Sequence, residues 1–262
     1  MLGFKDMIDK NEHDKMKEIY STNLTSNVKR SVSPDSIRMV NKDGKEVSLS
    51  ELNETLVNSL IISDSIILWT DDDSSESFFN IIKGAGILLR NFIIGGLPLR
   101  GCITLGEFSL RYSQMRSNRQ NIQMTIFGKA ITNAYSKTDI QQWVGCTVDN
   151  DAIKKFREWE KKHSTMSNFA SIEWFCKLKL LARYKVPLKY GPLEKKYVID
   201  WISNTEITER IIREAFSKHK KTVNDWDVRY KLENTIKFYQ FIKMKKTHIQ
   251  YDAFTLRDVP PK

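Results

Sequence analysis

Hydrophobic positions in the middle of the chain recur at helical spacing. The repeat of three and four residues predicts a helix with one face in the core. The positions that define this face are Phe78, Ile81, Ile82, Ala85, Leu88, Leu89 and Phe92. Acidic and serine residues at 71–75 predict an N-terminal cap. Gly95-Gly96, followed by Pro98, predicts the end of the helix.

Apolar runs on both sides of this helix predict strands. They cover residues 60–69, 99–108, 122–127 and 144–148, and a helix is expected over 128–137. The first run is either one strand or a tight hairpin that folds at Ser63-Asp64. A weaker hairpin is expected between residues 37 and 49, with its tip at Asn41–Gly44. This order of elements predicts an α+β sandwich with helices on one face of a mostly antiparallel sheet.

The pattern changes after residue 150, where helical periodicity dominates. The expected helices are 152–162, 167–178, 206–220 and 226–243, and the expected strands are 181–188 and 196–201. We therefore predict a core domain over residues 1–150. Residues 151–262 form a mainly helical C-terminal extension packed on the same domain.

Composition narrows the class of protein. Of the 262 residues, 40% are hydrophobic and 28% are charged, as in soluble globular proteins. The longest apolar runs are too short to span a membrane, and the N-terminus has no signal-peptide pattern, so a cytoplasmic protein without membrane insertion is expected. The three cysteines, Cys102, Cys146 and Cys176, show neither zinc-ligand nor redox spacing.

The charge is strongly basic. The net charge of +10 attracts polyanions such as nucleic acid, anionic lipid or a triphosphate. Much of it lies in lysine runs after residue 150, for example Lys154-Lys155 and Lys161-Lys162. Such runs on helices are usually solvated faces, so nucleic acid is a possible partner but not the favoured one.

One acid stands in an unusually apolar place. Asp64 is flanked by Leu60-Ile61-Ile62 and Ile66-Ile67-Leu68. A carboxylate there is costly unless it is paired, binds a metal or lies at a turn. The alternative to a metal ligand is an aspartate that caps its own hairpin turn.

Four segments together resemble class III nucleotidyl cyclases, and most closely the bacterial pyrimidine cyclases of Pycsar anti-phage systems. They are Met1-Leu2-Gly3-Phe4-Lys5-Asp6, Ser63-Asp64-Ser65, Leu99-Arg100-Gly101-Cys102-Ile103-Thr104-Leu105-Gly106-Glu107 and Gly128-Lys129-Ala130 through Ala134-Tyr135. The later run Tyr184-Lys185-Val186-Pro187-Leu188-Lys189 also fits those proteins. The resemblance implies the class III fold, a ferredoxin-type sandwich.

The resemblance also implies a metal site. Cyclases of this family hold two divalent cations, Mg²⁺ or Mn²⁺, on two aspartates, and Asp64 matches the second of them. The first belongs to an Asp-x-Leu-Gly-Phe-Lys pattern, so it is expected immediately upstream of Met1. Gly3, Phe4 and Lys5 would then bind phosphate where a strand passes into a helix, or form a plain turn.

Two further residues stand at functional positions of the family, and Arg100 is a third candidate from its place in a predicted strand. Asn133 corresponds to an asparagine that orients the ribose, and Lys137 stands where the family has an arginine that stabilises the transition state. An exposed helical lysine is the alternative for Lys137. Arg100 would bind phosphate, or pair with Glu107 or another acid. Family sites lie between two protomers, which implies a homodimer.

The function expected from this resemblance is conversion of CTP or UTP to the 3′,5′-cyclic nucleotide and pyrophosphate. The product would be a second messenger for a separate effector in anti-phage defence. One alternative is a purine-specific cyclase. Another is a catalytically impaired pseudo-cyclase or a basic nucleic-acid-binding protein.

Overall fold

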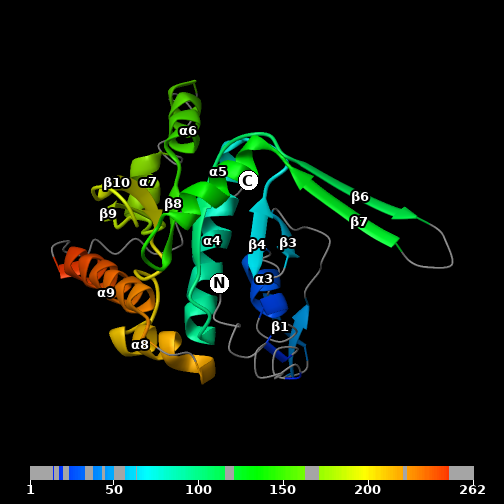
Figure 1. The fold of residues 1–262 in the computed structure, drawn as a ribbon. Coiled ribbons are helices and arrows are strands. Elements are labelled where there is room, and N and C mark those ends of the chain that lie inside the picture. The colour runs from blue at the N-terminus through cyan, green and yellow to red at the C-terminus, as the bar shows by residue number, and fades with distance from the viewer. Residues whose placement is uncertain are drawn as a thin grey trace.

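The protein has a mixed α+β architecture (Figure 1). The computed structural model describes residues 14, 18–19, 24–32, 38–42, 45–49, 57–62, 64–115, 121–162, 171–220 and 223–247. The elements in chain order are α3 (Thr25–Val32), β1 (Arg38–Lys42), β2 (Lys45–Leu49), β3 (Asn58–Ile62), β4 (Ser65–Trp69), α4 (Ser75–Gly95), β5 (Arg100–Ile103), β6 (Ser109–Met115), β7 (Asn121–Phe127), α5 (Lys129–Asp139), β8 (Gly145–Val148), α6 (Asn150–Lys162), α7 (Ile172–Lys177), β9 (Leu181–Val186), β10 (Glu194–Ile199), α8 (Glu209–Ser217), the short 3₁₀ helix η2 (Lys218–Lys220) and α9 (Trp226–Thr247).

The central helix α4 begins and ends where the sequence predicts. The Ser74 hydroxyl accepts a hydrogen bond from the Ser77 backbone N–H at 3.1 Å. The Asp72 carboxylate accepts another from the Ser74 N–H at 3.0 Å. At the other end Gly96 adopts φ 80°, the left-handed conformation that favours glycine. Both predicted caps are therefore confirmed.

Four strands form the main sheet, in the order β5-β8-β10-β9. β5 and β8 are parallel, whereas β8–β10 and β10–β9 are antiparallel. Strands from both sides of residue 150 thus belong to one sheet: Tyr197 pairs with Val148, and Val198 with Thr147. The predicted strands at 181–188 and 196–201 are present as β9 and β10.

Helices cover both faces of this sheet, so the expectation of helices on one face is wrong. Side chains alternate along a strand, and Tyr184 therefore faces away from the side that carries Ile199. The Ile199 side lies against α4, close to Gly86. On the other side Tyr184 contacts Phe238 and Phe241 of α9, with ring centroids 4.9 and 5.0 Å apart. Periodicity along the sequence shows that a strand is buried, but not which helix covers it.

Helix α4 separates two hydrophobic clusters. Ile82, Leu89 and Ile93 belong to the larger cluster, which contains the four-stranded sheet. Leu88 and Phe92 belong to a second cluster with α3. In Figure 1 the β3–β4 hairpin and the β8–β10 region accordingly lie on opposite sides of α4.

Two buried sides explain the apolar composition of α4. Among the described helices it alone is long and apolar enough to cross a membrane. That is weak evidence for a membrane span, because the core helix of a folded domain passes the same test.

Two hairpins confirm sequence predictions, and one strand is shorter than expected. β1–β2 and β3–β4 are antiparallel hairpins, the second with Asp64 in its turn. The expected strand 99–108 ends at Ile103. The Thr104 hydroxyl then donates to the Ala130 carbonyl oxygen at 3.0 Å, which holds the chain against α5 instead of a neighbouring strand. β6–β7 follows and projects from the body as a long arm (Figure 1).

Candidate functional site

Asp64 lies in the turn of the β3–β4 hairpin. Ile62 pairs with Ser65, and Asp64 lies in the tight turn between them. Strong β-propensity on both sides, with Ile61 opposite Ile66, sets this register. The Asp64 side chain is half-buried. The hairpin thus confirms the tight-turn alternative for the backbone and presents the carboxylate at the end of two strands.

The carboxylate of Asp64 can bind one cation, but a metal site needs further ligands. Among the described residues, no three or more His, Cys, Asp or Glu side chains gather as a metal cluster. Mg²⁺ commonly binds one or two carboxylates together with substrate phosphates and water. The donor chemistry of Asp64 therefore fits one ligand of a metal–triphosphate complex. The expected phosphate-binding residues Gly3, Phe4 and Lys5 lie outside the described residues.

The second part of the candidate site is α5, whose first turn depends on Gly128. Gly128 has φ 143°, and a Cβ there would come within 2.5 Å of Phe108 Cα and 2.7 Å of the Glu107 carbonyl oxygen. Both contacts are with the loop between β5 and β6. Gly106 in that loop approaches Ala130. The two glycines therefore allow α5 and this loop to approach each other closely.

We expect Gly128→Ala to destabilise the fold by about 1–3 kcal/mol, because it combines strained backbone with a backbone clash. Gly86→Ala is the matched control: its Cβ would meet only ordinary contact at 3.5 Å in a helix interior. There alanine should be neutral or stabilising. Urea unfolding followed by circular dichroism measures both changes. Equal effects of the two substitutions would contradict the assignment.

Asn133 and Lys137 lie one turn apart on α5. Lys137 Nζ is 2.5 Å from Asp149 Oδ2; the Asp149 side chain is 7% exposed and that of Lys137 is 35% exposed. Burial lowers the pKa of Lys137, but the hydrogen bond and charge of Asp149 outweigh it, so the net pKa is raised. Lys137 therefore stays cationic and is held at the edge of the sheet.

A buried polar network around Gln141 holds the backbone of α5 at Lys137. The Gln141 amide nitrogen donates to the Lys137 carbonyl oxygen at 2.9 Å and lies 3.0 Å from the Thr147 hydroxyl. The amide oxygen of Gln141 accepts from Trp143 Nε1 at 2.9 Å. Satisfied buried networks of this kind restrict side-chain geometry. The end of α5 and strand β8 thus hold one rigid arrangement.

Arg100 joins β5 to the C-terminal end of α5. Its guanidinium donates to the carbonyl oxygens of Asp139 and Gln141 at 2.8 and 2.9 Å. It also donates to the Asp139 carboxylate at 2.9 Å. Pairing with an acid, the alternative to phosphate binding, is therefore present, but with Asp139 rather than Glu107. The positive charge of Arg100 also interacts favourably with the negative, C-terminal end of the α5 dipole.

Asp139 lies between two cations. Lys189 Nζ is 3.0 Å from the carboxylate atom that Arg100 also contacts. The hydrogen bond from Lys189 is the main cause that lowers the pKa of Asp139, and the charges of Lys189 and Arg100 add to it. The carboxylate is half exposed, so the pair is partly screened by solvent.

Because the folded pKa of Asp139 is lowered, its stabilisation is present above the unfolded pKa of about 4 and is lost as the pH falls through the folded value. We expect Asp139→Asn to cost about 1 kcal/mol or less at pH 7. The difference from the parent should shrink toward pH 3. Urea unfolding at several pH values measures it. A penalty that stays constant down to pH 3 would contradict the pairing.

Comparisons with known proteins do not decide between these interpretations. No protein-family model, curated protein or solved structure matches the chain. The case for a function therefore depends on the residues and their geometry.

The thiols do not supply an alternative chemistry. Burial raises the pKa of Cys102 and Cys176, and it raises that of Cys146 well above the usual value. A raised pKa disfavours the nucleophilic thiolate at neutral pH. Cys102, on β5, lines the same small pocket as Lys137 of α5. It contributes to packing.

Sequence reasoning missed the partners Asp139, Gln141 and Asp149. Asp149 directly follows a predicted buried strand, where an acid needs a partner. That signal was available. No sequence pattern predicts the role of Gln141, because that role depends on the parallel pairing of β5 with β8.

Proposed function

We propose that this protein is a nucleotidyl cyclase that converts CTP or UTP to the 3′,5′-cyclic nucleotide and pyrophosphate. The proposal joins the resemblance to class III cyclases with the geometry of two elements. One is the β3–β4 hairpin with Asp64 in its turn. The other is α5, which carries Asn133 and Lys137 one turn apart.

The hairpin is the observation that carries the proposal. A two-residue turn between strongly apolar strands places the Asp64 carboxylate at a defined point, as a metal ligand requires. In the reaction the ribose 3′-oxygen attacks the α-phosphorus and the bond to the pyrophosphate leaving group breaks. Two divalent cations, Mg²⁺ or Mn²⁺, when bound would favour the 3′-alkoxide and neutralise phosphate charge. Asp64 would hold them together with an aspartate expected upstream of Met1.

The residues on α5 would act on the nucleotide itself. Asn133 would orient the ribose through its amide, and Lys137 would place positive charge near the phosphates. Asp149 acts as a positioning residue, because it fixes Lys137 Nζ without removing it wholly from solvent. Arg100 would contribute to phosphate binding, although its described contacts hold the end of α5.

A homodimer is part of this proposal, because the family builds each site from two protomers. Two features support it. The β6–β7 arm projects from the body (Figure 1), and one of its faces carries Leu110 and Met124, which are 40% and 42% exposed. Exposed apolar groups on a projecting hairpin suit contact with a second copy.

The assay is direct. The chain, and a form extended by the residues encoded upstream of Met1, are incubated with each of ATP, GTP, CTP and UTP in the presence of Mn²⁺. Products are separated by chromatography. Cyclic CMP or cyclic UMP supports the proposal, whereas cyclic AMP or cyclic GMP would assign the purine-specific alternative. Absence of every cyclic product from the extended form would overturn the proposal and favour a pseudo-cyclase.

The biological setting follows from the same resemblance. The cyclic nucleotide would act in the cytoplasm as a second messenger in anti-phage defence, read by a separate effector protein. Release of product in cells that carry the gene, during phage infection, tests this part.

A further inference from the structure

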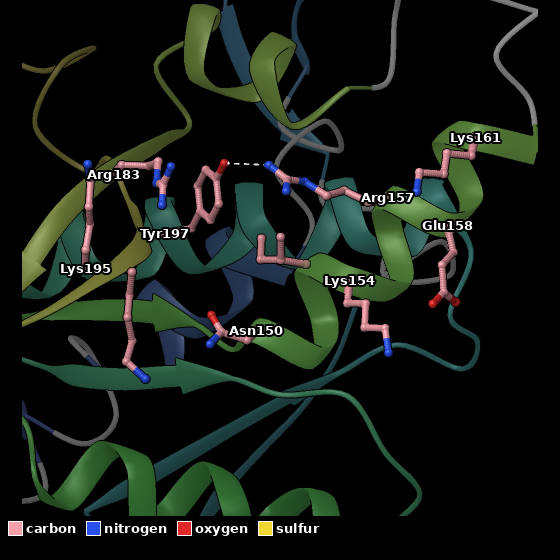
Figure 2. Close-up of a pocket in the computed structure, with 10 residues that line it drawn as sticks. Asn150, Lys154, Arg157, Glu158, Lys161, Arg183, Lys195 and Tyr197 are labelled. Carbon is pink, nitrogen blue, oxygen red and sulfur yellow. Dashed lines mark hydrogen bonds between the residues drawn. The ribbon is translucent and has the colours of Figure 1, made fainter.

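A basic cavity lies between α6 and the β9–β10 hairpin (Figure 2), and Lys196 lines both this cavity and the small pocket that contains Lys137 and Asp149. Its volume is about 470 Å³, within the range of ligand-binding clefts. Six cations and one carboxylate, Glu158, line it. The cations are Lys154, Arg157, Lys161, Arg183, Lys195 and Lys196. We call this cavity the α6 groove.

The two walls of the α6 groove come from segments that are distant in the sequence. Lys154, Arg157 and Lys161 share one face of α6, at helical spacing, over a length of about 10 Å. Arg183 pairs in register with Tyr197, and Lys195 lies two residues before Tyr197 on the same face of the sheet. The cations of the helix thus face Arg183 and Lys195 across the cavity, whereas Lys196 belongs to the other face of the sheet.

Tyr197 organises the centre of the groove. Its hydroxyl accepts a hydrogen bond from Arg157 at 3.0 Å, drawn as a dashed line in Figure 2. The Arg183 guanidinium lies 5.3 Å from the centre of the ring, within cation–π range. Both guanidiniums are therefore oriented by the same side chain. Buried Ile153 completes the wall of α6.

Acids balance this charge only in part. Lys196 pairs with Glu194 at 2.8 Å, and Arg157 has Glu173 at 3.8 Å. Lys154 and Lys195 make no ion pair with any residue in the described part of the chain. Some other surface cations are closely paired, for example Arg213 with Glu209 and Lys155 with Asp73. Like charges gathered across one cavity repel each other and destabilise the fold, and a bound polyanion reverses that cost.

We propose that the α6 groove binds the phosphate backbone of a nucleic-acid strand. The row of cations is too long for one phosphate group and suits several phosphates of a chain. Its lining side chains are mostly exposed, whereas a small-molecule site buries most of its ligand. On sequence alone, Lys154 and Lys161 are expected on a solvated helix face. The opposed cations of β9–β10 are what change that interpretation.

The test measures binding of fluorescein-labelled 20-nucleotide single-stranded RNA, single-stranded DNA and duplex DNA to the full chain. Fluorescence anisotropy is recorded between 50 and 300 mM KCl. The variant is Lys154→Gln/Lys195→Gln. The matched control is Lys29→Gln/Lys237→Gln, which removes the same charge from exposed positions on α3 and α9.

We expect the groove variant to bind about tenfold or more weakly near 0.1 M salt, with a salt slope lower by about 1.4, or 0.7 per lost phosphate contact. The control should keep nearly all affinity, and the three labelled strands show which nucleic acid fits. No binding by the parent chain, or equal losses in both variants, would overturn the proposal. If the groove variant loses binding to phosphatidylserine vesicles but keeps its binding to nucleic acid, the α6 groove would be assigned to a membrane surface instead. Cyclase activity is not measured here, so this result is independent of the proposed function.

Discussion

Asp64→Asn is expected to reduce formation of cyclic nucleotide by about 10²–10³-fold. The substitution keeps the shape of the side chain and removes the negative charge that a divalent cation requires. A metal supplies several kcal/mol of transition-state stabilisation, and each 1.4 kcal/mol corresponds to tenfold in rate. Stability should change little, because Asp64 lies in a hairpin turn. Product formation is measured with CTP and UTP in the extended form of the protein.

The control for Asp64→Asn is Asp225→Asn, an exposed acid near the start of α9. It should retain full activity. Full activity of Asp64→Asn would show that the carboxylate only serves its turn.

Mixing Asp64→Asn with Asn133→Ala tests the shared site. If two protomers form each site, mixed dimers contain one intact site, and about a quarter of the activity should return. If the mixture forms no cyclic nucleotide although each variant is folded and dimeric, a site between protomers would be contradicted.

Lys137→Met should destabilise the protein by about 3 kcal/mol, and Asp149→Asn by only about 1 kcal/mol. The asymmetry follows from exposure. Asp149 is 7% exposed, so loss of its partner leaves a buried charge. Lys137 is 35% exposed and can reach water when Asp149 is neutral. Urea unfolding at pH 7 measures both free energies of unfolding.

The double variant Lys137→Met/Asp149→Asn supplies the internal check, since it removes both charges. It should be more stable than Lys137→Met alone, with a coupling energy of about 1–2 kcal/mol. Additive losses would contradict a buried pair. Lys137→Arg, which restores the residue of the resembled family, separates the roles: it should keep stability and at least the parent's rate per folded molecule.

Local elements were predictable where sequence signals agree with short-range physics. The caps of α4 at Ser74 and Gly96 and the β1–β2 hairpin depend on neighbouring residues and were predicted, and the β3–β4 hairpin was one of two alternatives for its segment. The end of β5 at Ile103 was not. It depends on a hydrogen bond between Thr104 and Ala130, 26 positions apart in the chain.

The candidate site divides in the same way. Sequence alone singles out Asp64, because an acid among β-branched residues needs an explanation, and it leaves a tight turn there as one of two alternatives. The partner of Arg100 was left open between Glu107 and another acid. Only the packing of α5 against β5 brings Asp139 to it.

By itself, then, the sequence determined most of the helices and strands, the caps of α4 and a strongly basic chain, but it predicted neither α3 nor β6. These properties depend on periodicity, capping and composition. Tertiary structure decided that β10 pairs with β8, that helices cover both faces of the sheet, and that Arg183 and Lys195 face α6 across a cavity. Such contacts join segments tens of residues apart, and their energy depends on burial and distance in the folded chain. No local pattern along the chain carries that information.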